Sequence, residues 1–129
     1  MQTAEQFAEI MTDQTPFHFA DPADLRIADY ERRTAGTVYS PEILRKSSAA
    51  DYGGIEVENR LANISQPILV LAGRYNRTCS VEASQFTAAN APNAELVIFE
   101  ESAHMTYVEE NERYITAVRA FLNRHAVQR

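Results

Sequence analysis

The hydrophobic positions of the chain change their rhythm near residue 63. In residues 1–62 apolar residues recur at helical spacing, without a continuous apolar run. The stretch AEQFAEIM (4–11) predicts a short helix with one apolar side, and SPEILRKSSAA (40–50) predicts another. The apolar side of the first helix consists of Phe7, Ile10 and Met11.

A further helix is predicted within DPADLRIADYERR, residues 21–33. Asp21 is a suitable N-cap, Pro22 lies in the first turn, and Gly36 ends the helix. The glycine pair Gly53–Gly54 then predicts a turn toward the second half of the chain. The apolar contacts expected from the helix are Leu25, Ile27 and Tyr30.

Residues 63–129 have a different pattern, in which continuous apolar runs alternate with helical ones. PILVLAG (67–73) and AELVIFE (94–100) are typical of strands buried on both faces. Between them SVEASQFTAAN (80–90) predicts a helix capped by Ser80. A last helix is predicted over NERYITAVRAFLNRH (111–125), with an apolar stripe made of Tyr114, Ile115, Val118, Phe121 and Leu122.

The order strand, helix, strand, helix predicts an α/β fold with a right-handed parallel βαβα unit. Functional residues of such sheets gather at the carboxyl ends of the strands. Two loops, GRYNRTCS (73–80) and EESAHMTYVEE (100–110), follow those ends and should lie side by side. Their candidate side chains are Arg74, Asn76, Arg77 and Cys79 in the first loop, and Ser102, His104 and Glu109 in the second.

Charge and composition narrow the classes of partner. The net charge is −6, and the basic residues are scattered, which argues against nucleic acid and against anionic membrane lipids. No stretch reaches the roughly 18 apolar residues of a membrane-spanning helix, and the start of the chain lacks a signal-peptide pattern. We therefore expect a cytoplasmic protein.

One cysteine and three separated histidines restrict the metal and redox chemistry. Cys79 cannot form a disulfide within the chain, and the histidines have no recognisable metal-ligand spacing. We expect no metal and no other cofactor.

The two loops and their flanking strands resemble the C-terminal part of an α/β-hydrolase. The strand ending in AGRYN, the helix, the second strand, the ESAHM loop and the last helix ending in FL follow that family's order. Residues 1–62, especially TPFHFADPADLRIADYERR and YGGIEVENRL, are similar to the helical cap of the proline iminopeptidase group. The resemblance implies a cap-like segment over 1–62 and a βαβα part of a hydrolase core over 63–129.

The resemblance assigns roles to two residues. His104 matches the triad histidine, the general base that takes the proton of a nucleophile and returns it to the leaving group. Asn76 stands where the family has the triad acid. An amide cannot stabilise the imidazolium by charge, and an Asp-to-Asn change at this position in chymotrypsin-type enzymes lowers turnover by about 10⁴-fold. The triad is therefore incomplete.

The nucleophile motif of the family, G-x-S-x-G, does not occur in the 129 residues, because none of the four glycines flanks a serine. The first six strands that the resemblance implies are not in the sequence either. The first interpretation is a hydrolase C-terminal fragment that is inactive alone. The alternatives are one half of a split serine hydrolase or aminopeptidase, completed by a partner chain, and a non-enzymatic, self-associating module.

Substitute catalytic groups are weaker candidates. Cys79 is expected to pack at a helix entry, Ser102 to bind the local backbone, and Ser80 to cap a helix. Four glutamates near the loops are expected to be solvated rather than to support His104: Glu82, Glu100, Glu101 and Glu109.

Residues of the cap-like segment are candidates for a substrate pocket. Helix packing is the alternative, and the favoured, role of the aromatic group made of Phe17, His18, Phe19, Tyr30 and Tyr39. In amino-peptide-cleaving members of the family, acidic cap residues hold the free amine of the substrate. The possible equivalents here are Glu31, Glu56 and Glu58.

A parallel sheet of two strands is a poor independent unit, because apolar strands need lateral partners. The strand at 67–72 should have a bare edge, which invites pairing with another chain. We therefore expect either a homo-oligomer or a complementing hydrolase half at this edge.

Overall fold

The structure is a computed structural model that describes residues 3–50 and 56–126. The predicted turn at Gly53–Gly54 lies outside these residues. No helix in the described ranges is long and apolar enough to cross a membrane.

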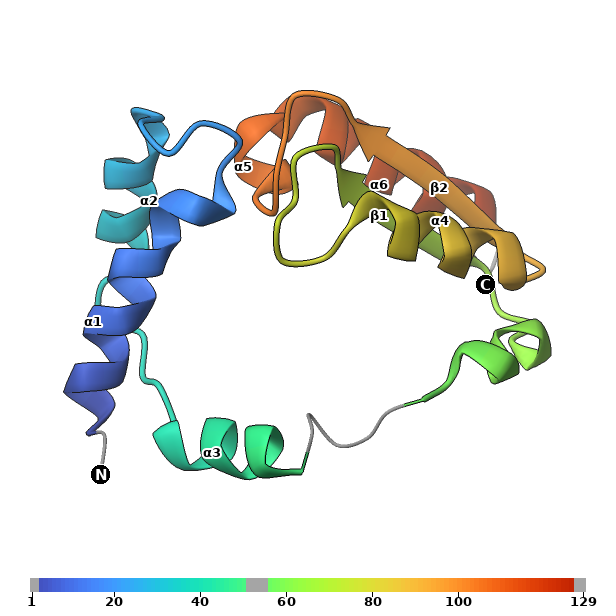
Figure 1. The fold of residues 1–129 in the computed structure, drawn as a ribbon. Helices are drawn as coiled ribbons and strands as arrows, with labels where there is room; N and C mark the ends of the chain where they lie inside the picture. Colours follow the sequence, from blue (N-terminus) through green and yellow to red (C-terminus); the bar gives the residue numbers. More distant parts are fainter. Residues whose placement is uncertain (1–2, 51–55, 127–129) are drawn as a thin grey trace.

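The first half of the chain is helical and contains no strand in its described part. Its elements are α1 (Ala4–Gln14), η1 (Thr15–His18), α2 (Arg26–Thr34), α3 (Pro41–Ala49) and η3 (Glu58–Asn63). A capping box starts α1, because the Thr3 side chain accepts from the Gln6 backbone while the Gln6 side chain accepts from Thr3. In Figure 1, α1 and α2 adjoin the end of the sheet through η1, whereas α3 stands apart.

The predicted N-cap of α2 at Asp21 is wrong by four residues, because the structure has Leu25 at that position. The Asp21 carboxylate instead accepts from the Ala23 N–H at 2.9 Å, which closes a turn two residues on. The helix begins after a second such turn, in which Asp24 accepts from the Arg26 N–H at 2.8 Å. Leu25, expected to make apolar contacts, is consequently 94% exposed. The predicted end is confirmed, because Gly36 takes a φ of 88° just beyond the helix.

The second half has the predicted βαβα order and confirms the α/β fold class. Its elements are β1 (Ile68–Gly73), α4 (Val81–Asn90), β2 (Ala94–Phe99), α5 (Thr106–Glu109) and α6 (Asn111–His125). The strands are parallel and pair in register from Ile68 with Ala94 to Gly73 with Phe99. In Figure 1, α4 lies in front of the sheet and α6 behind it. The single turn α5 is not predicted by the sequence.

Burial of the strands is shallower than their composition predicts. Ala72 and Phe99 are buried, but most of both strands is only half-buried, because two strands and two helices cannot enclose a sheet. The apolar stripe of α6 is likewise open to solvent, with Ile115 37% and Leu122 57% exposed. Among the described residues, a buried cluster joins the two halves and consists of Phe19, Ile27 and Met105, with Tyr30 and Val108 packed against it.

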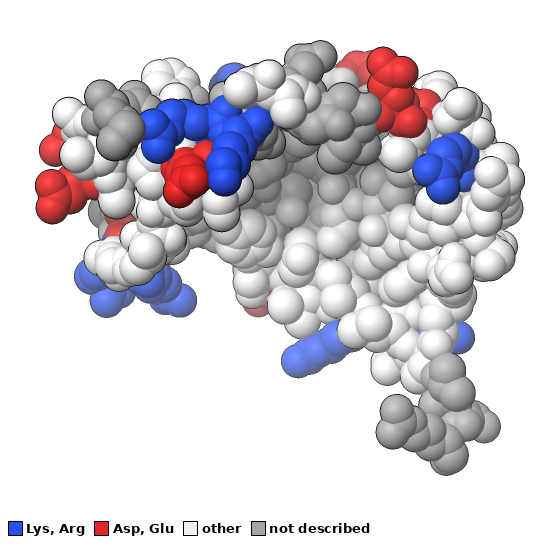
Figure 2. All heavy atoms as spheres, turned by 90° about the horizontal axis from the view of Figure 1, so that it is seen from below, with Lys and Arg blue, Asp and Glu red and all other residues white. Residues whose placement is uncertain are grey.

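The molecule exposes more surface than a compact protein of its size. Its accessible area is 9366 Å², whereas a compact monomer of this mass exposes about 6,900 Å². On the face in Figure 2 the Lys and Arg residues lie in several separate places. Exposed apolar side chains, such as Leu122 on α6, are part of this surface.

Candidate functional site

The two strand-end loops lie side by side, as predicted. The Arg74 N–H donates to the Phe99 carbonyl at 2.8 Å, and the Tyr75 N–H donates to the Ser102 carbonyl at 2.9 Å. Gly73 permits this approach, because a Cβ at that position would lie 1.8 Å from the Ala103 carbonyl oxygen.

His104 is held by its backbone while its imidazole remains available. Its N–H donates to the His18 carbonyl at 2.9 Å. The His104 ring makes no hydrogen bond to any residue that the structure describes, and it faces the His18 ring at 5.2 Å between centroids. An exposed imidazole without a partner can accept or donate a proton to a bound group.

Asn76 does not support His104. Its side-chain oxygen accepts from the Thr78 N–H at 3.0 Å and from the Cys79 N–H at 3.1 Å, so it closes its own loop. Within the described ranges no hydrogen bond joins Asn76 to His104. Cys79 is exposed and free. The structure therefore brings the two loops together without assembling an acid–histidine pair.

Ser102 is engaged away from His104, and the expected bond to local backbone is wrong. The side chain is fully buried and donates to Glu110 Oε2 at 2.6 Å. Burial alone would raise the pKa of Glu110, but hydrogen bonds from Ser102, Arg113 and the Glu101 backbone outweigh it and lower that pKa. Ser102 is thus a structural group bound to a carboxylate.

Glu109 is not solvated, which corrects the prediction for this residue. Oε1 accepts from the Ala20 N–H at 2.7 Å, and Oε2 accepts from the Ala103 N–H at 2.8 Å. Both oxygens are therefore committed to backbone amides rather than to His104. The other candidate acids are exposed as expected: Glu82, Glu101 and Glu100, of which the last is paired with Arg74 at 2.8 Å.

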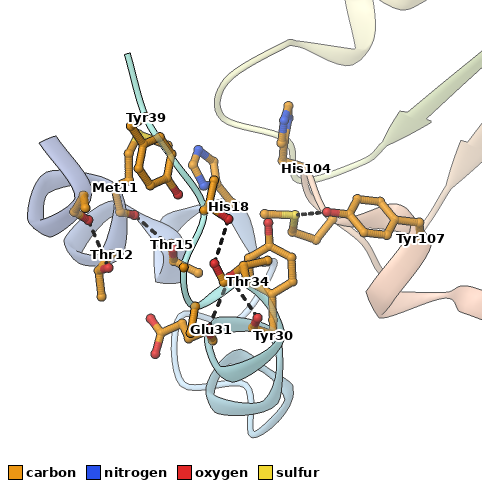
Figure 3. A pocket seen from close by; sticks show the side chains of 15 residues that line it. Met11, Thr12, Thr15, His18, Tyr30, Glu31, Thr34, Tyr39, His104 and Tyr107 are labelled. Atoms are coloured by element: carbon orange, nitrogen blue, oxygen red, sulfur yellow. Dashed lines mark hydrogen bonds between the residues drawn. The ribbon is translucent and has the colours of Figure 1, made fainter. Parts of the chain in front are cut away.

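A pocket of about 410 Å³ opens between the cap-like helices and the His104 loop. His18, Tyr39 and His104 all line it, and in the view of Figure 3 the His18 ring lies between Tyr39 and His104. Glu31 is its one acidic lining residue, and no lysine or arginine of the described chain lines it. The remaining large side chains of the wall are Met11, Tyr30, Tyr39, Met105 and Tyr107.

Only part of the predicted aromatic group reaches the pocket. Phe17 is 59% exposed and Phe19 is fully buried in the core, so neither lines it. Glu56 and Glu58 are also absent from its wall. Nothing local in the sequence indicates that His18 meets His104, because that contact joins residues far apart along the chain.

Two groups of the pocket have shifted proton affinities. Burial, and to a smaller extent His104, lowers the pKa of His18, so that its neutral form is favoured. Burial together with Tyr30 raises the pKa of Tyr107 to about 12. The pocket therefore has a largely neutral imidazole next to His104 and a protonated phenol elsewhere in its wall.

The chain is similar in sequence to known proline iminopeptidases and to a methyl ester esterase. No protein-family model matches it. It is 36% identical over 77 residues to a proline iminopeptidase of Clostridioides difficile, covering 60% of this chain and 26% of the relative. It is 30% identical over 125 residues to a proline iminopeptidase of Lactiplantibacillus plantarum, covering 95% and 42%. It is 25% identical over 72 residues to a pimeloyl-[acyl-carrier protein] methyl ester esterase of Aliivibrio fischeri, covering 56% and 28%.

Solved structures agree with the sequence relatives on the fold. An α/β fold family hydrolase from Bacillus anthracis superposes with a TM-score of 0.78 at 21% identity, covering 93% of this chain and 42% of that one. The chain thus spans less than half the length of the relatives it matches. The chain thus has the fold of part of an α/β-hydrolase, and its sequence is similar to those of proline iminopeptidases.

Proposed function

We propose that this chain supplies the catalytic histidine and a wall of the substrate pocket in a serine-hydrolase site, and that the 129 residues do not hydrolyse substrates alone. The observation that carries the proposal is the position of His104. Its imidazole has no hydrogen-bond partner among the described residues and stands at the edge of a pocket, while no serine of the nucleophile motif is in the sequence. The serine must then come from residues outside these 129.

The proposed reaction is hydrolysis of an ester or of an N-terminal residue's amide through an acyl-enzyme. His104 takes the proton of the serine as its oxygen attacks the carbonyl carbon, and returns it to the leaving alcohol or amine. Water, deprotonated by the same imidazole, then releases the acid. The relatives named proline iminopeptidase and methyl ester esterase support these two substrate classes.

Glu31 favours the amide alternative. It is the one carboxylate in the pocket wall, and tyrosines surround the same space. A primary or secondary ammonium group on the substrate would find its counter-charge there. We assign the binding of a substrate amine to Glu31 rather than to Glu56 or Glu58, which do not line the pocket.

A serine-directed fluorophosphonate tests the proposal. The isolated chain should remain unlabelled and should cleave neither p-nitrophenyl esters nor proline arylamides. A chimaera in which this chain replaces its matching segment of the L. plantarum proline iminopeptidase should be labelled on the serine of that enzyme. Labelling of the isolated chain, at Ser102 or elsewhere, would refute the proposal.

We also propose that the free edge of β1 receives the complementing part of the hydrolase sheet. The N–H groups of Ile68 and Arg74 both donate to the β2 side. Because backbone groups alternate along a strand, Leu69 and Leu71 direct theirs to the opposite, unpaired edge. This edge corresponds to the predicted contact at 67–72.

The outer edge of β2 is less suited to pairing. Arg113 Nη2 donates to the Ile98 carbonyl at 2.8 Å, and its guanidinium lies over the Phe99 ring at 5.1 Å. A charged side chain on an outer carbonyl blocks the approach of another strand. The edge of β1 is therefore the favoured site.

A pair of proline substitutions tests the docking edge. Leu69→Pro removes a donor that points to the free edge, where proline is tolerated, whereas Val70→Pro removes a bond of the β1–β2 ladder. Leu69→Pro should leave the fold intact and abolish concentration-dependent association in sedimentation. Association that survives it, or a compact monomer for the unaltered chain at micromolar concentration, would contradict the proposal. Homo-oligomers of the unaltered chain would identify a second copy as the occupant.

A further inference from the structure

Residues 17–20, which we call the bridge segment, comprise the end of η1 and the two residues after it, and they contact both strand-end loops. Three of its carbonyl oxygens accept from one guanidinium in the loop after β1. Arg77 Nη1 donates to Phe17 at 3.2 Å and to Phe19 at 2.9 Å, and Nη2 donates to Ala20 at 3.3 Å. A planar guanidinium fork can make these bonds together, whereas a single ammonium group could not hold the same geometry.

The loop after β2 binds the same segment from its other side. The fourth carbonyl, that of His18, accepts from the His104 N–H at 2.9 Å. Glu109 accepts from the Ala20 N–H at 2.7 Å and from the Ala103 N–H at 2.8 Å. All four carbonyls of the bridge segment, and the backbone N–H groups of residues 103 and 104, are thus tied into one network.

We propose that Arg77 and Glu109 are positioning residues, which clamp the bridge segment between the two loops and thereby fix His104 against the pocket wall. Neither residue lines the pocket, so both act through backbone. This proposal rests on the proposed function in one respect, because it treats His104 as the catalytic histidine. The clamp itself can be measured without any activity.

Glu109→Gln is the sharpest variant, because the two side chains have almost the same shape. A carboxylate accepts from two N–H groups, whereas an amide offers one oxygen and turns an N–H₂ group toward the other donor. One of the two hydrogen bonds that Glu109 accepts, from Ala20 or from Ala103, must therefore be lost. The fold should persist, since Phe19 stays buried and the Arg26 guanidinium still binds the Glu109 carbonyl at 2.6 Å. Glu101→Gln, at an exposed glutamate in the same loop, is the matched control.

The experiment is hydrogen exchange and histidine titration, measured by NMR on the full chain. In Glu109→Gln and in Arg77→Lys, exchange at the Ala20 and His104 amides should rise about tenfold or more, which corresponds to the loss of about one buried hydrogen bond. Backbone amides that pair β1 with β2, such as that of Ala72, should keep their hydrogen-exchange rates. The pKa of His18 should rise toward its usual value as the segment opens to solvent and the contact with His104 loosens.

Unchanged exchange in both variants would overturn the clamp. An equal rise at every amide, or loss of the fold, in both variants would also overturn it, because the residues would then hold the whole structure. Failure of the chimaera to hydrolyse substrates would refute the proposed function and leave this result unaffected.

Discussion

At the scale of residues, the central feature is Asn76, the residue at the proposed acid position. The Asn76 oxygen accepts two loop N–H groups, which a carboxylate oxygen at the same position would accept at least as well. The group that differs is the amide nitrogen, which carries no negative charge and cannot accept a hydrogen bond from an imidazole N–H. Residue 76 therefore keeps the oxygen that closes its loop, but it lacks the second carboxylate oxygen that could accept a hydrogen bond from an imidazole.

Asn76→Asp should therefore restore function without cost to the fold. In the chimaera with the L. plantarum enzyme it should raise turnover, with about 10⁴-fold as the upper bound. The thermal midpoint of the isolated chain should be unchanged or slightly higher. Ser80→Asp, at the nearby helix cap, is the control that adds a carboxylate without placing it at the acid position. A gain from that control equal to the gain from Asn76→Asp would contradict the assignment of the acid position.

His18 gives a stability prediction with a defined sign. Its folded pKa lies below 6.5, so the unfolded state binds more protons between the two values. The contribution to the free energy of unfolding is complete above the unfolded pKa and is lost as pH falls through the folded one. Urea midpoints should fall on acidification below about pH 6.5, and His18→Asn should flatten this fall. An equally steep fall in the variant would contradict the prediction.

The sequence singles out His104 and Asn76 as candidates because a short motif surrounds each of them. It could not reveal that Ser102 binds Glu110 or that Glu109 bridges two backbone segments. Both bonds depend on how α5 orients the loop after β2, and α5 is a single turn without a periodic signal.

At the scale of elements, Gly73 determines how closely the loops approach. A side chain there would meet backbone atoms of Ser102 and Ala103, which cannot move without displacing the His104 loop. Gly73→Ala should cost about 3 kcal/mol of unfolding free energy. Gly36→Ala, where a Cβ meets no atom within 4 Å but φ is +88°, should cost only about 1 kcal/mol. Equal losses in urea denaturation would contradict the close approach.

The strands and the long helices of the second half could be predicted because their periodicity and caps agree. Ser80, for example, accepts from the Ala83 N–H at 3.3 Å as the sequence indicates. The start of α2 could not, because Asp21 and Asp24 both precede helix-like residues and either can close a turn. Local competition between two aspartates decides that boundary.

At the scale of the whole molecule, the excess surface is the main physical anomaly. The difference of about 2,500 Å² from a compact monomer lies at the upper end of the roughly 1,000–2,500 Å² that each partner buries in an obligate interface. A partner chain would gain most by covering the exposed apolar stripe of α6 and by pairing with the free edge of β1. The apolar composition of the strands predicted burial that the 129 residues alone cannot provide.

The central claim is that His104 acts as the general base for a serine supplied from outside these residues. The most direct measurement is turnover of a proline arylamide by the chimaera carrying Asn76→Asp, with and without His104→Ala. The account predicts a loss of at least about 10³-fold for His104→Ala, no comparable loss for His125→Ala, and unchanged thermal midpoints. Turnover that survives His104→Ala in a folded chimaera would contradict it.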